Sequence, residues 1–155
     1  PDIAVFGQKD AQQCRLVRKM ARELNFPAEV IIGPTVREAD GLAMSSRNVC
    51  LDPGERRAAA CVPRALALAG SLCESGERDA GEIRKKMRAL IEGNPPALID
   101  YVEILDYGSW KPLDRVSGPD LVALAVRIGK VRLIDNSIIG DVAVPPGFWT
   151  QPLPR

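Results

Sequence analysis

The sequence predicts an α/β remnant, a strand–helix–strand piece of an open parallel sheet, followed by a small α+β domain with a three-stranded antiparallel sheet. Two short apolar runs near the amino terminus flank a segment whose apolar residues recur every three or four positions, which is the helical period. Three longer apolar runs, rich in β-branched residues, follow in the second half of the chain and indicate strands.

The first unit is expected to pair its two strands in parallel. Residues 3–6 form an apolar run that ends at Gly7, and residues 30–32 form another that ends at Gly33 and Pro34. The intervening helix is predicted from the spacing of Leu16, Val17, Met20, Ala21 and Leu24. A helical crossover of this length forces parallel pairing. Because two strands are too few for such a sheet, we expect the chain to begin inside a larger α/β domain.

Helices are predicted next, with clear start and stop signals. Asp52 as N-cap, Pro53 at the first helical position and Glu55 as the capping-box acid indicate a helix start. We expect this helix to bend or restart near Pro63, which lacks a backbone donor. A second helix, with a stripe formed by Ile83, Met87, Leu90 and Ile91, is expected to stop before Gly93.

Three strands are predicted after the helices, at residues 98–105, 121–128 and 131–138. The last two are separated by Gly129 and Lys130, which suits a two-residue hairpin turn with glycine first. The tail over residues 140–155 contains several prolines and glycines and is expected to be irregular.

Composition limits the classes of partner. Lys and Arg number 21 and Asp and Glu number 20, with the two signs interspersed, so we expect neither a nucleic-acid nor a membrane partner. The chain has no apolar run of membrane-spanning length and no signal-peptide pattern at its amino terminus. We therefore expect a soluble, cytoplasmic protein.

The cysteines predict neither a metal site nor a disulfide framework. Cys14, Cys50, Cys61 and Cys73 form no closely spaced pair, and the chain contains no histidine to complete a zinc site. A chain of 155 residues can also bury a core without disulfides. We expect buried or partly buried free thiols and no metal ligands.

Polar residues that suit phosphate binding concentrate in two segments. Lys9 follows the first strand, where a parallel sheet opens its ligand crevice and the next helix offers free N–H groups. The alternative is that Lys9 and Asp10 form an ordinary solvated pair at a helix start. Ser45, Ser46 and Arg47 offer hydroxyls and a forked cation that suit polyphosphate oxygens. The alternative is a plain turn, in which such residues are common.

The order of these segments is more specific than either alone. "FGQKDAQQ" (residues 6–13) and "PTVREADGLAMSSRN" (residues 34–48), followed by "DYVEILD" and "VRLIDN", closely resemble the pantothenate synthetase (pantoate–beta-alanine ligase) family. The resemblance covers nearly the whole chain. It implies that residues 1–35 end a Rossmann-like nucleotide-binding domain and that residues 36–155 form a carboxyl-terminal α+β lid domain with the ATP loop, the boundary falling near Thr35.

The resemblance also implies a reaction, namely ATP-dependent ligation of pantoate and beta-alanine through a pantoyl adenylate, with Mg²⁺, in an enzyme that is a homodimer when intact. Lys9, Ser45, Ser46 and Arg47 would be its catalytic residues, and Gln13 would bind pantoate. The ATP-binding residues would be Gly7, Gln8, Lys9, Asp10, Val36, Met44, Ser45, Ser46 and Arg47. The apolar flank at residues 42–44 would help the loop exclude water, with Gly41 as its pivot.

One departure from the family pattern defines the alternatives. The family carries a histidine-containing phosphate motif early in its sequence, and this chain has no histidine. We therefore expect half of the active site to be missing and the chain to be inactive alone. Two other hypotheses stay open, namely a different nucleotidyltransferase-like ligase, against which Gln13 argues, and a non-catalytic binding domain that folds from Val36 onward.

Overall fold

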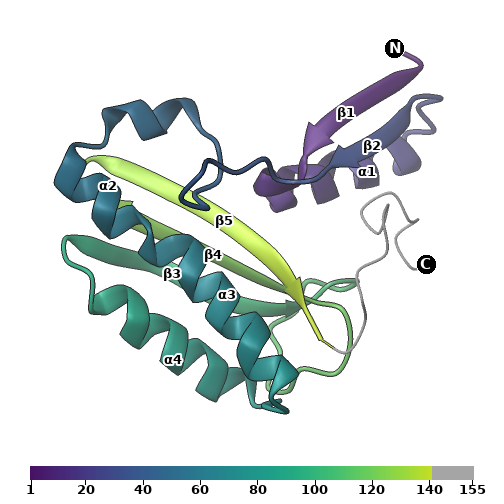
Figure 1. Cartoon of the computed structure of the whole chain (residues 1–155). Coiled ribbons are helices and arrows are strands. Elements are labelled where there is room, and N and C mark those ends of the chain that lie inside the picture. The colour runs from purple at the N-terminus through teal and green to yellow at the C-terminus, as the bar shows by residue number, and fades with distance from the viewer. Residues whose placement is uncertain (141–155) are drawn as a thin grey trace.

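Two separate sheets organise the chain, as the computed structural model describes for residues 1–140 (Figure 1). β1 (Ile3–Gly7) and β2 (Glu29–Gly33) pair in parallel. β3 (Ala97–Asp106), β4 (Asp120–Ile128) and β5 (Val131–Ile139) form an antiparallel sheet with β4 in the centre. Both predicted sheets are confirmed. The predicted irregular tail lies, after residue 140, outside the described residues.

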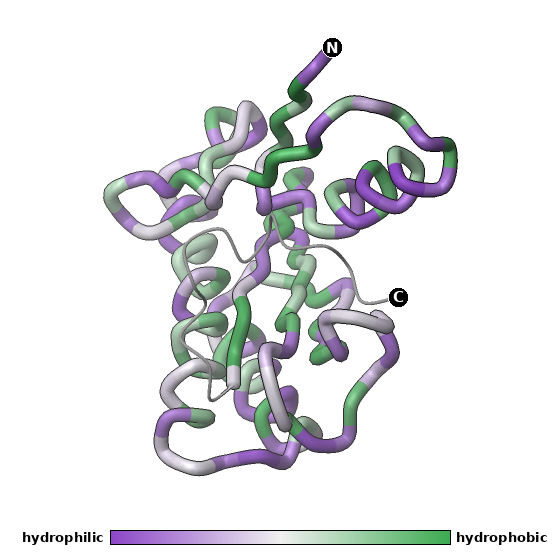
Figure 2. The backbone as a smooth tube through the Cα atoms, turned by 90° about the vertical axis from the view of Figure 1, so that its right-hand side faces the viewer, coloured by the Kyte–Doolittle hydropathy of each residue, from purple (hydrophilic) through white to green (hydrophobic). Residues whose placement is uncertain are grey.

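The amino-terminal unit buries little of its apolar surface. Its helix α1 (Ala11–Glu23) follows a 3-10 turn, η1 (Gln8–Asp10), and so begins before the predicted apolar stripe. Only Ala11 and Cys14 are buried on α1, whereas six large apolar side chains of this unit are 47% to 68% exposed: Ile3, Val5, Leu16, Met20, Leu24 and Phe26. Figure 2 shows the hydrophobic colour along β1. The stripe predicted for α1 is therefore mostly a surface within residues 1–140.

The helices of the second unit begin where their caps predict. The Asp52 side chain accepts from the N–H groups of Gly54 and Glu55, and the Glu55 carboxylate accepts from the Asp52 N–H, so the predicted capping box is present. The first helix is divided into α2 (Pro53–Ala59) and α3 (Cys61–Glu74). The break falls at residue 60, and Pro63 lies in the first turn of α3, where a missing N–H breaks no helical hydrogen bond.

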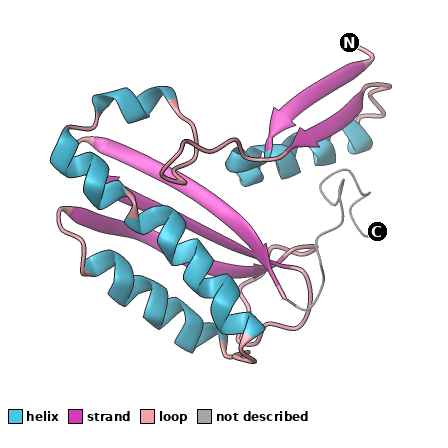
Figure 3. Ribbon diagram, viewed as in Figure 1, coloured by secondary structure: helices cyan, strands magenta, loops and turns pink. Residues whose placement is uncertain are grey.

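The main core lies between the helices and one face of the antiparallel sheet. α3 and α4 (Ala80–Glu92) run side by side across this face (Figure 3). They bury Ile83, Met87 and Ile91 completely against alternate residues of the strands. The opposite face packs a smaller cluster, centred on Cys14, Ile32 and Leu121, beneath α1.

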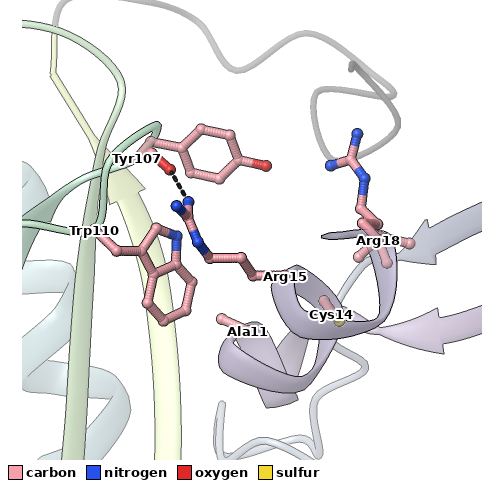
Figure 4. Close-up of a pocket in the computed structure, with 7 residues that line it drawn as sticks. Ala11, Cys14, Arg15, Arg18, Tyr107 and Trp110 are labelled. Atoms are coloured by element: carbon pink, nitrogen blue, oxygen red, sulfur yellow. Dashed lines mark hydrogen bonds between the residues drawn. The ribbon is translucent and has the colours of Figure 1, made fainter. Parts of the chain in front are cut away.

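A second contact attaches α1 to the turn after β3. Arg15 Nη1 donates to the carbonyl oxygens of Tyr107 (3.3 Å) and Gly108 (2.6 Å), and the guanidinium carbon lies 5.3 Å from the centroid of the Trp110 ring (Figure 4). Trp110 takes a positive φ of 61°, which places its indole beside Arg15. The cavity left at this junction measures only about 10 Å³, enough for one water molecule at most. The contact joins the two sheets and leaves no room for a ligand.

The four free thiols differ in exposure, and the expectation that all would be at least partly buried is wrong for Cys50. Cys14, Cys61 and Cys73 are buried, whereas Cys50 is exposed. Burial raises the pKa of the Cys61 thiol to about 11 and also raises the pKa of Cys14. Three of the four thiols are therefore protected from reagents in the folded protein.

The hairpin between β4 and β5 turns at Gly129, as predicted, with Ile128 paired to Val131. Gly129 has a φ of +56°, and a Cβ added there would collide with Glu55 Oε1. Gly76 also has a positive φ, of +96°, but a Cβ there would meet open space.

Gly129→Ala should therefore destabilise the protein more than Gly76→Ala. Each variant loses about 1 to 2 kcal/mol because alanine disfavours the left-handed region. Gly129→Ala should lose about 1 kcal/mol more, because it expels Glu55 from its hydrogen bond to Asp52. Urea unfolding of both variants measures the difference, and equal losses would contradict the steric argument.

Candidate functional site

The 3-10 turn η1 lies where the two parallel strands end. Gly7 at the end of β1 is paired with Gly33 at the end of β2, so the segments that follow both strands leave the sheet side by side. Lys9 extends from η1 to the second of these segments, where its Nζ donates to the carbonyl oxygens of Met44 (3.0 Å) and Ala43 (3.5 Å). The two segments singled out in the sequence are therefore in direct contact.

The electrostatic surroundings of Lys9 have mixed signs. Burial lowers the pKa of its ammonium group below the ordinary value, while the carboxylates of Asp135 and Asp10 oppose the shift. Arg47 and Arg37 add to the lowering, which means that they are close enough to repel the ammonium. Because Arg37 is paired with Asp135 at 2.7 Å, Lys9 and Arg47 are the cations of this set that can attract an anion.

The segment after β2 folds back on itself as a short hairpin over residues 36–44, called the loop hairpin below. The Met44 N–H donates to the Val36 carbonyl and the Glu38 N–H to the Leu42 carbonyl, both at 2.9 Å. Gly41 makes the turn with a φ of +85°. Val36 is 64% exposed, but its carbonyl oxygen is already bonded to Met44, so its N–H is the group left for a ligand.

The apolar side of the loop hairpin differs from the sequence expectation. Leu42 and Ala43 are each only 2% exposed, and Leu42 belongs to the main core. Leu42 anchors the loop hairpin to that core, and neither buried side chain is free to shield a ligand from water. Of the flank at residues 42–44, Met44 alone is exposed, at 55%. Gly41 lies in a turn braced by hydrogen bonds, since its carbonyl accepts from Arg37 (2.9 Å).

The predicted hydroxyls and cation follow the loop hairpin. Ser45 caps the 3-10 helix η2 (Ser46–Cys50), and its Oγ accepts from the Arg47 N–H (3.3 Å). Arg47 is exposed and forms no ion pair with any residue of the described part of the chain. A hollow of about 690 Å³ lies beside this segment, lined by Glu38, Met44, Ser45, Ser46, Asn48, Val49 and Arg56.

Several charged and amide side chains that the sequence did not single out brace this hollow. The Arg56 guanidinium donates to the carboxylates of Glu38 and Asp40, each at 2.7 Å. Asn48 Nδ2 donates to Glu38 and to the Ala43 carbonyl. These hydrogen bonds lower the pKa of Glu38, with the bond from Asn48 the largest cause. The ionised carboxylate is thereby kept as an anchor for Arg56 and Asn48.

Two consecutive polar residues of β5 also reach the site and were missed as site residues. Asp135, only 2% exposed, accepts two bonds from Arg37, at 2.7 and 3.1 Å. Asn136 donates through Nδ2 to the carbonyls of Gln8 (3.1 Å) and Lys9 (2.9 Å). A signal was present, because Asp135 occupies the strand position where the alternation of Val131 and Leu133 predicts an inward apolar residue.

A groove of about 440 Å³ lies between the start of α1 and the face of the antiparallel sheet that is turned away from α3 and α4. Its α1 side is formed by Lys9, Asp10, Ala11, Gln12 and Gln13. Its sheet side includes Tyr101, Glu103 and Arg132. The predicted residues Lys9, Asp10 and Gln13 thus share one wall, whereas the Gln8 side chain is directed to Asn136 (3.5 Å).

This arrangement of groups suits a polyphosphate. Lys9 and Arg47 provide cations from two segments, and the hydroxyls of Ser45 and Ser46 lie between them in the sequence. Charge-assisted bonds of this kind are the strong ones in phosphate recognition.

Within residues 1–140 no group of three or more acidic, cysteine or histidine side chains could hold a metal ion. No helix in the same range is both long and apolar enough for a membrane span.

Comparison with known sequences gives a consistent picture. The family model for pantoate-beta-alanine ligase matches residues 1–138. The chain is 56% identical over 142 residues to the pantothenate synthetase of Pelotomaculum thermopropionicum, an alignment that covers 92% of this chain and 50% of that protein. It is 54% identical over 139 residues to the pantothenate synthetase of Heliobacterium modesticaldum, covering 90% and 50%.

Solved structures are similar too. The crystal structure of pantothenate synthetase from Thermus thermophilus matches with a TM-score of 0.84 at 39% identity, over 88% of this chain and 49% of that one. Pantoate-beta-alanine ligase from Francisella tularensis, complexed with beta-gamma ATP and beta-alanine, matches with a TM-score of 0.60 at 26% identity, over 89% and 44%. The chain spans about half the length of the relatives it matches.

The Arg37–Asp135 pair should be the most stability-sensitive contact of this site. Arg37→Met keeps the apolar stem but leaves the Asp135 charge buried without its partner. We expect a loss of about 2 to 3 kcal/mol, below the cost for a fully buried pair because the Arg37 side chain is 35% exposed.

Arg132→Met is the matched control, since Arg132 pairs with Asp100 at the surface (2.6 Å). Chemical denaturation of both variants measures the contrast, and a smaller loss for Arg37→Met than for Arg132→Met would show that the Asp135 pair is not a structural anchor.

Proposed function

The chain belongs to the pantoate-beta-alanine ligase family, and from this membership we propose that it forms one half of an enzyme that joins pantoate to beta-alanine with cleavage of ATP to AMP and pyrophosphate. The observation that supports this most directly is the contact between Lys9 and the carbonyls of Ala43 and Met44, because it brings the two candidate phosphate-binding segments together. The other half of the site would come from the part of the relatives that this chain does not cover.

The proposed reaction has two steps. A carboxylate oxygen of pantoate attacks the α-phosphorus of ATP, the bond to the β-phosphate oxygen breaks, and pyrophosphate leaves. The amine of beta-alanine then attacks the acyl carbon of the pantoyl adenylate, AMP leaves with the electrons of the acyl–oxygen bond, and the amine loses a proton. The first step accumulates negative charge on the leaving group, so its catalysis requires mainly positioned cations and hydrogen-bond donors.

Lys9 and Arg47 are the proposed cations. Lys9 donates to two backbone carbonyls, which keeps its ammonium group beside the loop hairpin. Arg47 is exposed and has its full guanidinium available for phosphate oxygens. Ser45 and Ser46 would add hydroxyl donors to the same oxygens. Mg²⁺ would arrive with ATP, bound mainly by phosphate oxygens, as is usual for this ion.

The remaining predicted residues are assigned to the two ends of the substrates. We propose that Gln13, on the groove wall, donates to pantoate, and that Gly7, Gln8 and Asp10 lie along the nucleotide. Val36 and Met44 would border the adenine at the loop hairpin. We propose that the domain boundary lies near Thr35, between the end of β2 and the loop hairpin. We also propose that the intact enzyme is a homodimer.

Arg47→Ala should impair adenylate formation without affecting folding. For this test the chain is joined in one polypeptide to the half of the Pelotomaculum thermopropionicum protein that it does not cover, called the reconstituted enzyme below. The expected loss of transition-state stabilisation is about 2 to 4 kcal/mol, typical for one preorganised charge-stabilising group. ATP–pyrophosphate exchange measures it, with Arg22→Ala, an exposed arginine in the last turn of α1, as the control. Exchange within about twofold of the unmodified protein would refute the assignment.

The chain on its own should release no AMP from ATP in the presence of pantoate, beta-alanine and Mg²⁺. Without the other wall of the site, neither reactant is held in attack geometry, a contribution worth about 7 to 11 kcal/mol. A coupled assay for AMP decides this. AMP release that depends on both organic substrates would mean that these 155 residues contain a complete site.

A further inference from the structure

Asp135 and Asn136, adjacent on β5, each hold one of the two segments proposed to bind ATP. We propose that they are a pair of positioning residues which fix Lys9 and the segment Ser45, Ser46 and Arg47 in one arrangement before ATP binds. The inference deepens the proposed function and rests on it for the identity of the ligand. Both residues lie in the "VRLIDN" segment that resembles the family, but neither is among the site residues predicted from the sequence.

Asn136 holds the first segment through its backbone. Its side-chain amide donates to the carbonyls of Gln8 and Lys9, at 3.1 and 2.9 Å, and its Oδ1 accepts from Gln8 Nε2 at 3.5 Å. Asn136 is 3% exposed, so water does not compete effectively for these bonds. The 3-10 turn η1 shows no side-chain cap of its own. The amide of Asn136 therefore supplies the fixation that η1 lacks locally.

Asp135 holds the second segment through Arg37. The carboxylate accepts both bonds of a fork from the guanidinium, a planar geometry that fixes direction as well as distance. The same Arg37 donates to the Gly41 carbonyl at the turn of the loop hairpin (2.9 Å). Asp135 Oδ1 also accepts from the Asn136 N–H (2.8 Å), which orients the carboxylate from within β5.

These contacts close into a ring. From Asn136 the ring passes through the backbone of η1 to the Lys9 side chain, and from there to the Ala43 and Met44 carbonyls. It returns along the loop hairpin to Arg37 and Asp135, the neighbour of Asn136. Because every member has a partner inside the ring, a change at either β5 residue changes the position of Lys9 relative to Ser45.

The ring also explains which charges meet at the site. Asp135 pairs directly with Arg37 and also opposes the burial that lowers the pKa of Lys9. A single buried carboxylate thus holds one cation in place and stabilises the charged form of another. Neither Asp135 nor Asn136 needs to touch the ligand for this, which distinguishes them from catalytic residues.

The first test follows the geometry without nucleotide. Hydrogen–deuterium exchange is measured on the 155-residue chain for residues 7–13 and 36–44, in Asn136→Ala and Asp135→Asn. We expect exchange at least tenfold faster in residues 7–13 for Asn136→Ala and in residues 36–44 for Asp135→Asn. Asn94→Ala, which loses an amide-to-carbonyl bond at the end of α4, and Asp100→Asn, which loses surface ion pairs, are the matched controls. Changes no larger than in these controls would overturn the proposal.

The second test separates positioning from general stability. In the reconstituted enzyme, Asn136→Ala should lower the rate of ATP–pyrophosphate exchange at least tenfold, but in a Lys9→Ala background it should have little further effect, because its influence passes through Lys9. Independent, multiplying effects of the two changes would overturn the proposal. Asn136→Ser, which keeps one donor, replaces Asn136→Ala if circular dichroism shows that the alanine variant is unfolded. If the unmodified reconstituted enzyme makes no adenylate, the proposed function fails. The hydrogen–deuterium exchange test on the 155-residue chain still decides whether β5 positions the two segments.

Discussion

The buried carboxylate of Asp135 is the constraint on which the site depends. A charge with a side-chain exposure of 0% is tolerated only when it is paired and fully hydrogen-bonded, and here Arg37 and the Asn136 N–H meet that requirement. Arg37 lies 98 residues away in the sequence, so the pairing fixes the connection after β2 against the last strand of the other sheet. Without the Asp135 charge no buried anion would need a partner, and Arg37 would lose the ion pair that directs its side chain toward β5.

The two sheets contribute unequally to the stability of the fold. The antiparallel sheet and its helices bury Met87, Ile91 and Val102 completely and form a core that is sufficient for a small domain. The parallel pair leaves Ile3 and Val5 exposed and relies on its contacts with the other unit, through Arg15 and the cluster around Cys14. The position of η1, which follows β1 and carries Lys9, therefore depends on the antiparallel sheet as much as on β1 itself.

Local patterns predicted most of the elements, and long-range contacts explain what they missed. Apolar runs rich in β-branched residues and the Gly129 turn located β4 and β5 to within a residue at each end, because the turn fixes where the two strands meet. Helix α1 was predicted, but its periodicity did not show which residues it buries, since Ala11 and Cys14 bury its first turn while Leu16 and Met20 face solvent. Lys9 and the serines were identified through the family resemblance, and the structure adds that their segments touch. Asn136 could not be assigned from sequence, because its partners are backbone carbonyls, which have no signature in the sequence.

The exposure of Cys50 makes the loop observable without any mutation. Cys50 ends η2, three residues after Arg47, and is exposed, whereas the other three thiols are buried. A maleimide dye or a nitroxide attached to the native chain would therefore report from a single point beside the candidate phosphate clamp. Fluorescence anisotropy or electron paramagnetic resonance could then follow the segment as nucleotide is titrated, with an unaltered Lys9, Arg37 and β5 beneath the probe.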